Sequence, residues 1–379
     1  MHRISVAHAL GRYEVLVGPG LLARLAELVA ARLPGRRTVM VSDDRVAELY
    51  RGFLASTDHA WHPAPRTCAD EPPPGWRAPL TFPAGERSKT RATWERLTDR
   101  MLAEGYGRDS AIVALGGGVV GDLAGFVAAT YMRGVPYVQV PTTTVAMLDA
   151  SVGGKVGVDT PAGKNLVGAF HPPALVVADP YTLLSLPDAE YRAGLAEAVK
   201  HALVADAAYF EWIEAEAGRI VAREPAALGA LVRRSVEIKA AVVSEDEREQ
   251  GRRATLNAGH TVAHALEQVT DYATSHGEAV AVGLVVECGL GERLGVTEPG
   301  TAARVRALLA RLGLGTDRPP LAGEAMLAAM TRDKKNRRGE IRLALPRGVG
   351  RMHEGDGTWT LPVAPAALRA ALRPGDHPG

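Results

Sequence analysis

The sequence predicts an α/β protein with two domains, a parallel-sheet domain followed by a mainly helical one. Short apolar segments that suit strands alternate with helical segments from Tyr13 to about residue 184. From about residue 185 to Leu314, apolar residues recur almost continuously at helical spacing. A chain of 379 residues also favours two hydrophobic cores over one. We therefore expect domains at residues 1–184 and 185–379.

The composition is that of an ordinary soluble protein, with 46% hydrophobic and 23% charged residues. The net charge of +1 indicates no nucleic-acid partner and makes any basic site a local one. Cys68 and Cys288 provide neither a disulfide framework nor a thiolate metal cluster. The N-terminus lacks the apolar core of a signal peptide, and no apolar run reaches the ~20 residues that span a bilayer. We expect a cytoplasmic protein without a membrane partner.

The first predicted elements are a strand, a helix and a second strand. Tyr13 to Val17 suits a strand, and apolar residues at helical spacing predict a helix between Leu21 and Val29. Thr38 to Val41 is the next strand, and Asp43 follows its end. An acid at this place in a parallel sheet can bind a nucleotide ribose hydroxyl. Asp43 is equally consistent with a helix cap or a solvated turn.

The next region gives weaker signals. Ser56 to Leu80 is rich in Pro and Trp, which indicates an irregular excursion without a domain boundary. The stretch FPAGERSK, from Phe82 to Lys89, then opens a helix. Glu86 and Lys89 near its start suit first-turn charges on a solvated surface.

A glycine-rich turn follows the central predicted strand. Ser110 to Leu115 is a buried strand that continues into GGGVVGD, residues 116–122. This matches G-x-G-x-x-G between a strand and an apolar helix, where backbone amides and a helix N-terminus face a pyrophosphate. The match departs from the usual fingerprint in two ways. It is not the first such turn of the chain, and no acid follows about 20 residues later.

Two basic, glycine-containing segments follow the strand Tyr137 to Val140 and its PTTT ending. They are Gly153-Gly154-Lys155 and Gly163-Lys164-Asn165. A P-loop is excluded, because Val158 occupies the position of its first glycine and Asn165 lacks the hydroxyl that binds magnesium. The two segments therefore predict a phosphate-binding surface of another kind.

Three segments of the helical half carry possible metal ligands. They are GLAEAVKHAL with Glu197, NAGHTVAHALE with His260 and His264, and SHGEAVAVG with His276. Two imidazoles and a carboxylate suit a catalytic divalent ion that keeps one position open. His260 and His264 share a helical face, but Thr261 stands where H-E-x-x-H requires Glu, which disfavours a zinc protease. Spacing alone leaves open which histidines bind the ion.

Basic residues lie upstream of these histidines. Lys239 and Arg253 belong to a charged stretch that leads into Asn257. One interpretation is a solvated helix face. The other is a clamp for a substrate carboxylate or phosphate, for which the bidentate guanidinium is well suited.

These residues carry a resemblance to a known family. The chain contains, in order, GGGVVGDLAGFVAATYMRGVPYVQVPTTTVAMLDASVGGKVGVDTPAGKN, GLAEAVKHAL, DERE, LNAGHTVAHALE and HGEAVAVG. From about Asp43 to Gly350 it strongly resembles the 3-dehydroquinate synthases, the shikimate-pathway members of the sugar phosphate cyclases. The resemblance implies a Rossmann-like NAD domain, a helical metal-binding domain and a homodimer.

The resemblance also assigns roles to residues of this chain. The metal, Zn or Co, would be bound by Glu197, His260 and His276, with His264 as an acid/base or positioning group. NAD would contact Asp43, Glu86, Lys89, Gly117, Gly118, Val119, Asp122, Thr142, Thr143, Asp149, Lys164, Asn165, Thr182, Ser185 and Leu186. The sugar-acid phosphate substrate would contact Arg133, Lys155, Asn165, Lys200, Lys239, Arg253, Asn257 and either Lys335, which we prefer, or Lys334. Arg133 is a candidate for reaching the site of the other subunit.

The implied reaction turns 3-deoxy-D-arabino-heptulosonate 7-phosphate into 3-dehydroquinate and phosphate, with transient NAD-dependent oxidation, for aromatic amino-acid biosynthesis. Asn257, His264 and Arg253 favour it over cyclases whose sugars lack a carboxylate. An aminodehydroquinate synthase would keep the same residues and remains an alternative. A metal- and NAD-dependent polyol or glycerol-phosphate dehydrogenase is the other alternative, but it would not need Lys155, Arg253 and Lys239 together.

Overall fold

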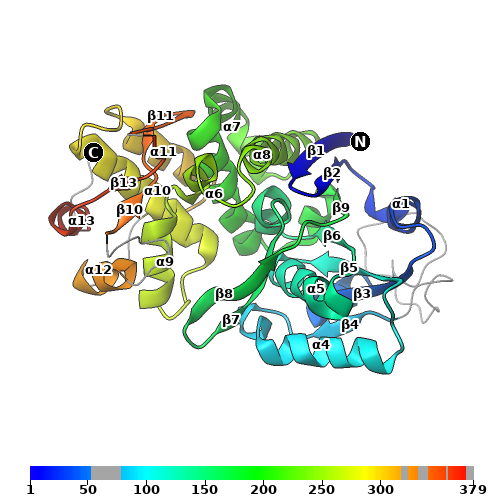
Figure 1. Ribbon diagram of the computed structural model, residues 1–379. Helices are drawn as coiled ribbons and strands as arrows, with labels where there is room; N and C mark the ends of the chain where they lie inside the picture. The colour runs from blue at the N-terminus through cyan, green and yellow to red at the C-terminus, as the bar shows by residue number, and fades with distance from the viewer. Residues whose placement is uncertain (53–77, 317–322, 332–339, 356, 373–379) are drawn as a thin grey trace. The chain divides into compact units, whose positions relative to one another are not determined.

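The computed structural model describes residues 1–52, 78–316, 323–331, 340–355 and 357–372 (Figure 1). The chain divides into two compact units, Met1–Leu186 and Pro187–Gly379. Lys334, Lys335 and most of the Pro-rich segment lie outside the described residues. Within the described ranges, no helix combines the length and the apolar character needed to cross a bilayer.

The first unit is built on a seven-stranded sheet with the strand order β1-β2-β9-β6-β5-β3-β4 (Figure 1). Its strands are β1 (His2–His8), β2 (Gly11–Val17), β3 (Arg37–Asp43), β4 (Leu80–Phe82), β5 (Ser110–Gly116), β6 (Tyr137–Pro141) and β9 (Leu175–Ala178). All neighbours are parallel except β1 and β2, which pair antiparallel. The sequence did not predict β1, because only Val6 of this polar edge strand is buried.

Apolar side chains alternate between the two faces of this sheet, so that each face holds its own core. Ile112 of β5 packs in the core that includes residues of α4 (Arg91–Ala103) and α5 (Gly118–Thr130). Val113 belongs to the opposite core, which includes residues of α1 (Leu25–Arg32). This layered arrangement confirms the predicted parallel α/β domain.

A β-hairpin accompanies the sheet. Its strands are β7 (Lys155–Thr160) and β8 (Gly163–Phe170), and they pair antiparallel. The segment Gly163-Lys164-Asn165 therefore lies at the start of a strand instead of in a loop before a helix, which agrees with the exclusion of a P-loop. The sequence did not predict this hairpin.

The second unit is mostly helical, as predicted (Figure 1). Its helices are α6 (Asp188–Ala205), α7 (Ala207–Val221), α8 (Pro225–Glu245), α9 (His260–Val269), α10 (His276–Arg293), α11 (Thr301–Arg311), α12 (Gly323–Thr331) and α13 (Pro365–Ala371). Two short antiparallel pairs complete it: β10 (Arg342–Leu343) with β13 (Leu361–Pro362), and β11 (Pro346–Gly348) with β12 (Arg351–Met352). The helix α10 is buried along most of its length.

Glycines in α10 allow its backbone to come into contact with the backbone of neighbouring elements. A Cβ at Gly277 would lie 1.8 Å from the carbonyl oxygen of Ala193 in α6. A Cβ at Gly283 would lie 2.0 Å from the carbonyl oxygen of Gly259, directly before α9. Both approaches are closer than any side chain permits, so α6, α9 and α10 can meet only with glycine at these positions.

We expect Gly283→Ala to destabilise the protein, because its new methyl would overlap the Gly259 carbonyl and push α9 from α10. The cost should be about 1–3 kcal/mol, or more if the helices cannot shift. Gly229→Ala in α8 is the control, since no described residue beyond its own helical turns comes within 4 Å of the new methyl. Urea unfolding measures the free energy of unfolding of both variants. Equal stabilities of the two variants would contradict the packing argument.

Candidate functional site

Helix α6 buries two opposite charges on one face. Glu197 and Lys200, three residues apart, have exposed fractions of 0% and 1%. The Nζ of Lys200 forms an ion pair with Oε2 of Glu197. Charges are costly to bury unless they are paired, and the i, i+3 spacing supplies that pairing within one turn.

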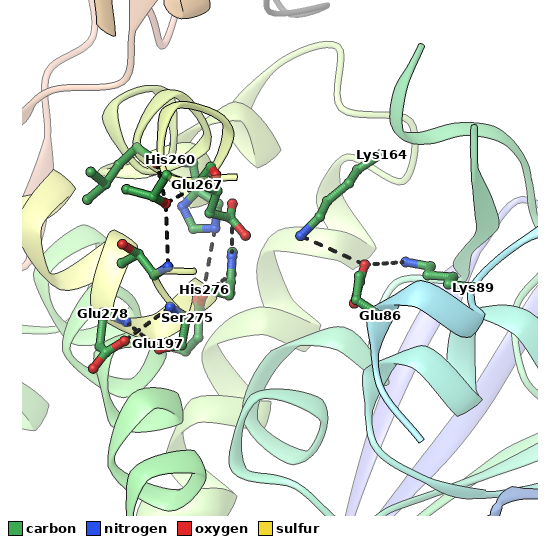
Figure 2. Close-up of polar contacts among 12 residues, drawn as sticks. Glu86, Lys89, Lys164, Glu197, His260, Glu267, Ser275, His276 and Glu278 are labelled. Carbon is green, nitrogen blue, oxygen red and sulfur yellow. Dashed lines mark hydrogen bonds and ion pairs between the residues drawn. The ribbon is translucent and has the colours of Figure 1, made fainter. Parts of the chain in front are cut away.

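Two imidazoles face the other oxygen of Glu197 (Figure 2). The Nε2 atom of His276 lies 3.2 Å from Oε1 of Glu197, and Nε2 of His260 lies 3.7 Å from the same oxygen. One donor atom from each of the three residues lies within 4.8 Å of the others. A carboxylate and two neutral imidazoles are the donor set of catalytic zinc and similar divalent ions, so these residues fit such an ion.

Each of these histidines is the first residue of a helix. Before His260, Gly259 adopts a left-handed conformation with φ of 78°. The buried carboxylate of Glu287 accepts hydrogen bonds from the backbone N–H groups of Gly259 (2.7 Å) and Val262 (3.2 Å). This carboxylate therefore caps α9 and fixes where His260 begins.

The helix of His276 is capped differently. Ser275 and Glu278 form a capping box, in which each side chain bonds the other residue's backbone N–H (Figure 2). The structure thus gives Glu278, which accompanies His276 in the sequence motif, a role in starting α10. The outer ring nitrogens are also occupied: Nδ1 of His260 lies 3.1 Å from the carbonyl oxygen of Ala258, and Nδ1 of His276 lies 3.7 Å from Oε2 of Glu267.

The electrostatics of this cluster favour positive charge. Burial lowers the pKa of His276, but the hydrogen bonds and charges of Glu197 and Glu267 outweigh that effect and raise it to about 10. The two carboxylates that stabilise a proton on His276 also attract a cation. This agrees with the donor set as a fit for a divalent metal ion.

The basic residues upstream are buried, which excludes the interpretation as a solvated helix face. Lys239 in α8 has an exposed fraction of 6%, and Arg253 one of 3%. A guanidinium Nη1 of Arg253 donates to the carbonyl oxygen of Glu247, and the side-chain amide of Asn257 donates to Glu249. The ring of His264 lies 5.7 Å from that of His260 and meets it edge-on.

The turn before Arg253 is organised by Asp246. Its carboxylate accepts hydrogen bonds from the backbone N–H groups of Gln250, Gly251 and Arg253. Burial raises the pKa of Asp246, but these bonds outweigh it and the pKa is lowered overall. The sequence offered no signal for this role beyond an acid in a charged stretch.

In the first unit, the glycines of G-x-G-x-x-G have separate roles. A Cβ at Gly116 would lie 2.5 Å from Val120, so packing requires this glycine, and one at Gly121 would lie 2.7 Å from the side-chain oxygen of Gln139, which would have to shift. A Cβ at Gly118, in the first turn of α5, would meet only Cβ of Ala150, at 3.8 Å, among the described residues outside its own helical turns. Packing does not explain this glycine, and an open backbone at a helix N-terminus is what a pyrophosphate needs. The turn therefore fits a dinucleotide.

Asp122, near the start of α5, forms a buried ion pair with Lys89. Figure 2 shows Lys89 beside Glu86 and Lys164. Lys89 has an exposed fraction of 4%, and its Nζ lies 2.6 Å from Oδ2 of Asp122 and 2.5 Å from Oδ1 of Asn165. Burial lowers the pKa of Lys89, but Asp122 and Glu86 outweigh it and raise the pKa. Glu86 is also 3.9 Å from Nζ of Lys164. The prediction that Lys89 is a solvated surface charge is therefore wrong.

Several residues predicted to contact NAD make hydrogen bonds within the protein. Asp43 caps α2 (Asp44–Leu49) by accepting from the N–H of Val46 at 2.8 Å, and burial raises its pKa. In the turn Pro180–Ser185, Thr182 donates to the carbonyl of Asp179 and Ser185 to that of Thr182. Leu186 ends this turn. These bonds leave further acceptor capacity on the carboxylate and hydroxyl oxygens.

The other predicted residues lie at strand ends and turns. Thr142 follows β6, and its buried hydroxyl has no partner among the described residues. Thr143 accepts from the N–H of Ala146 at 3.3 Å, and its methyl lies 2.9 Å from where a Cβ of Gly117 would stand. The remaining positions are Val119 in the first turn of α5, Asp149 in the turn Ala146–Ala150, Lys155 at the start of β7, and the exposed Arg133 with φ of 68°.

Sequence reasoning missed two buried carboxylates: Glu267, which lies beside Nδ1 of His276, and Glu287, which caps the helix that begins at His260. Glu267 follows His260 by seven residues, which is two helical turns, and therefore lies on the same side of α9. That spacing was visible in the sequence. Glu287 lies in the middle of α10, and no pattern in the sequence indicates that it caps another helix.

Comparison with known proteins identifies the family. Residues 79–193 match the model of the 3-dehydroquinate synthase N-terminal domain, and residues 194–336 match that of the C-terminal domain. The 3-dehydroquinate synthase of Halorhodospira halophila is 46% identical over 363 residues, which are 95% of this chain and 96% of that protein. That of Symbiobacterium thermophilum is 44% identical over 365 residues, 95% of this chain and 97% of that protein.

Solved structures agree with this assignment. A 2-epi-5-epi-valiolone synthase from Streptomyces hygroscopicus subsp. jinggangensis 5008, with NAD+ and Zn2+ bound, is 31% identical with a TM-score of 0.83, covering 98% of each chain. A 2-deoxy-scyllo-inosose synthase complexed with carbaglucose-6-phosphate, NAD+ and Co2+ is 27% identical with a TM-score of 0.84, covering 98% of this chain and 99% of that one. The likeness found from the sequence motifs is confirmed: this chain belongs to the 3-dehydroquinate synthase family.

Proposed function

We propose that this protein is a 3-dehydroquinate synthase, a carbon–oxygen lyase of the shikimate pathway. It converts 3-deoxy-D-arabino-heptulosonate 7-phosphate into 3-dehydroquinate and phosphate, with NAD and a divalent metal, Zn or Co, as cofactors. The observation that carries the proposal is the convergence of Glu197, His260 and His276 in a chain with relatives of that name at 43 to 46% identity. Two related cyclase structures contain NAD+ with Co2+ or Zn2+, which supports the cofactors.

Glu197, His260 and His276 would hold the metal, which when bound supplies Lewis acidity at a substrate oxygen. Lys200, which is paired with Glu197, can hold or give a proton at that place. NAD, when bound at the turn that contains Gly118, supplies a hydride acceptor for the same substrate. Lys89 and Asp122 would keep the N-terminal turn of α5 in place beneath it.

The substrate's charges need fixed partners. Arg253 is buried and already oriented by the Glu247 carbonyl, so it can bind a carboxylate with little loss of side-chain entropy. Lys155 and Lys239 would neutralise the phosphate and the charge that develops as it leaves. His264, which stands beside His260 without belonging to the converging donor set, would move a proton on the substrate.

We further propose that the protein works as a homodimer in the cytoplasm. Arg133 supports the dimer, because it is exposed in a left-handed turn before Gly134 and is free of the first unit's core. In this proposal its guanidinium contributes to the substrate site of the partner subunit.

We expect the metal-loaded protein with NAD and 3-deoxy-D-arabino-heptulosonate 7-phosphate to release phosphate and dehydroquinate in equal amounts without net NADH. A coupled phosphate assay and absorbance at the NADH wavelength measure both products. Absence of phosphate release would defeat the proposal. Turnover of only an amino analogue of this substrate would instead support an aminodehydroquinate synthase, and net NADH from a polyol would support a dehydrogenase.

His276→Ala should lower the affinity for Zn2+ or Co2+ by more than about 100-fold, because it removes one of three ligand side chains. Competition with a chromogenic chelator measures the affinity. His264→Ala is the matched control and should bind the metal nearly as well as the wild type, since His264 lies outside the donor set. Equal metal affinities of the two variants would refute the ligand assignment.

Gly118→Ala should weaken NAD binding about tenfold or more, equivalent to roughly 1.4 kcal/mol, while leaving stability near that of the wild type. The reason is that the methyl has room in the protein but would occupy the approach of the pyrophosphate. Gly121→Ala is the contrasting variant and should lose stability through overlap with Gln139. Calorimetric titration with NAD and urea unfolding separate the two effects. Unchanged NAD affinity in Gly118→Ala would place the cofactor elsewhere.

A further inference from the structure

We propose that Glu267 is a positioning residue of the metal centre, which holds the imidazole of His276 so that Nε2 points to the ion. The inference rests on the proposed function only for the identity of the centre as a metal site. It concerns a residue outside the donor set and outside every substrate or cofactor role assigned above.

The ring of His276 stands between two buried carboxylates (Figure 2). Its Nε2 lies 3.2 Å from Oε1 of Glu197, and its Nδ1 lies 3.7 Å from Oε2 of Glu267. The two nitrogens lie on different edges of the ring, so this pairing restricts the rotation of the imidazole and favours a proton on Nδ1 when Nε2 binds the ion. A proton kept on Nδ1 by Glu267 leaves Nε2 neutral and free to donate its lone pair.

Glu267 is a costly residue to place here. Its exposed fraction is 4%, and a buried carboxylate is tolerated only when it is paired or hydrogen-bonded. The other buried glutamate nearby, Glu287, uses its two oxygens to cap the backbone of α9. Glu267 instead directs Oε2 at a side chain of the centre. The two glutamates therefore have different roles, one for a helix and one for an imidazole.

The local fold presents Glu267 to His276. Glu267 and His260 lie two turns apart on one side of α9. The chain then reverses between α9 and α10, with Asp271 and Tyr272 at positive φ and the N–H of Tyr272 bonded to the carbonyl of Glu267 at 2.7 Å. This reversal brings the first residue of α10, His276, back beside the side chain of Glu267.

The outer nitrogens of the two histidines are held by unlike groups. The Nδ1 atom of His260 faces a backbone carbonyl, which no substitution can remove. The Nδ1 atom of His276 faces a charged side chain, which raises the basicity of the imidazole more than a neutral acceptor does. The contribution of Glu267 can therefore be measured by substitution, and its loss should weaken metal binding more than it weakens the fold.

The test compares Glu267→Gln with the wild type and with Glu278→Gln, all as full-length protein. Glutamine keeps the size of the side chain but removes its charge. We expect Glu267→Gln to bind Co2+ about 10- to 100-fold more weakly in chelator competition and to shift the visible absorption of bound Co2+. Glu278→Gln changes a capping residue of the same helix as His276 and should leave both readouts unchanged.

A structural role alone would act on the metal-free protein, so circular dichroism and thermal unfolding without metal are measured on each variant. Wild-type Co2+ affinity and spectrum in Glu267→Gln would overturn the proposal. If this variant does not fold, Glu267→Asp carries the test, because its shorter side chain withdraws the carboxylate from Nδ1. An unchanged Co2+ spectrum and affinity there would overturn the proposal, and a loss of affinity would support it.

The phosphate-release assay tests the proposed function without testing the role of Glu267. A wild-type protein that binds Co2+ but releases no phosphate contradicts the proposed function alone. The comparison of metal affinities between Glu267→Gln and the wild type then still decides the role of Glu267.

Discussion

The carboxylate of Glu197 is the interaction on which the second unit depends. It is fully buried, and three cationic or neutral nitrogens share its two oxygens: Lys200 on one, His260 and His276 on the other. Removing water from such a group is tolerable only because these partners surround it. Since the partners come from α6, α9 and α10, the electrostatic demand of one side chain also ties three helices together.

The close packing of α6, α9 and α10 brings these partners to Glu197. Gly259, Gly277 and Gly283 have no Cβ of their own where α10 meets α6 and the start of α9, so the backbones can come close there. In the first unit, glycine has a divided role within one turn. Side chains lie close behind Gly116 and Gly121, whereas no packing contact among the described residues requires Gly118. The same residue type thus marks packing in two places and an open approach for a ligand in the third.

Much of the fold could be predicted, because its central strands are uninterrupted apolar runs and its helices have regular apolar spacing. The strand β5 is buried at every residue, which no loop would be. The strand β1 could not be predicted, since it buries only Val6, and the hairpin β7–β8 is too rich in glycine and polar residues to show alternation. In the site, spacing could not show that Glu197 meets His276, because the contact depends on glycines at helix crossings. The burial of Lys89 could not be predicted, because its ion-pair partner, Asp122, lies 33 residues further along the chain, in α5.

The segment between the two ligand histidines has one further consequence. His260 and His276 begin their helices, and the chain between them contains one short helix and one tight reversal. Each extra residue in an α-helix advances the chain by about 1.5 Å and 100°. An insertion or deletion between them would therefore rotate or displace one imidazole, even if every contacting residue were retained. A substitution in residues 270–275 that keeps the Ser275 cap and the backbone reversal is compatible with the centre, whereas a change in the length of this stretch is not.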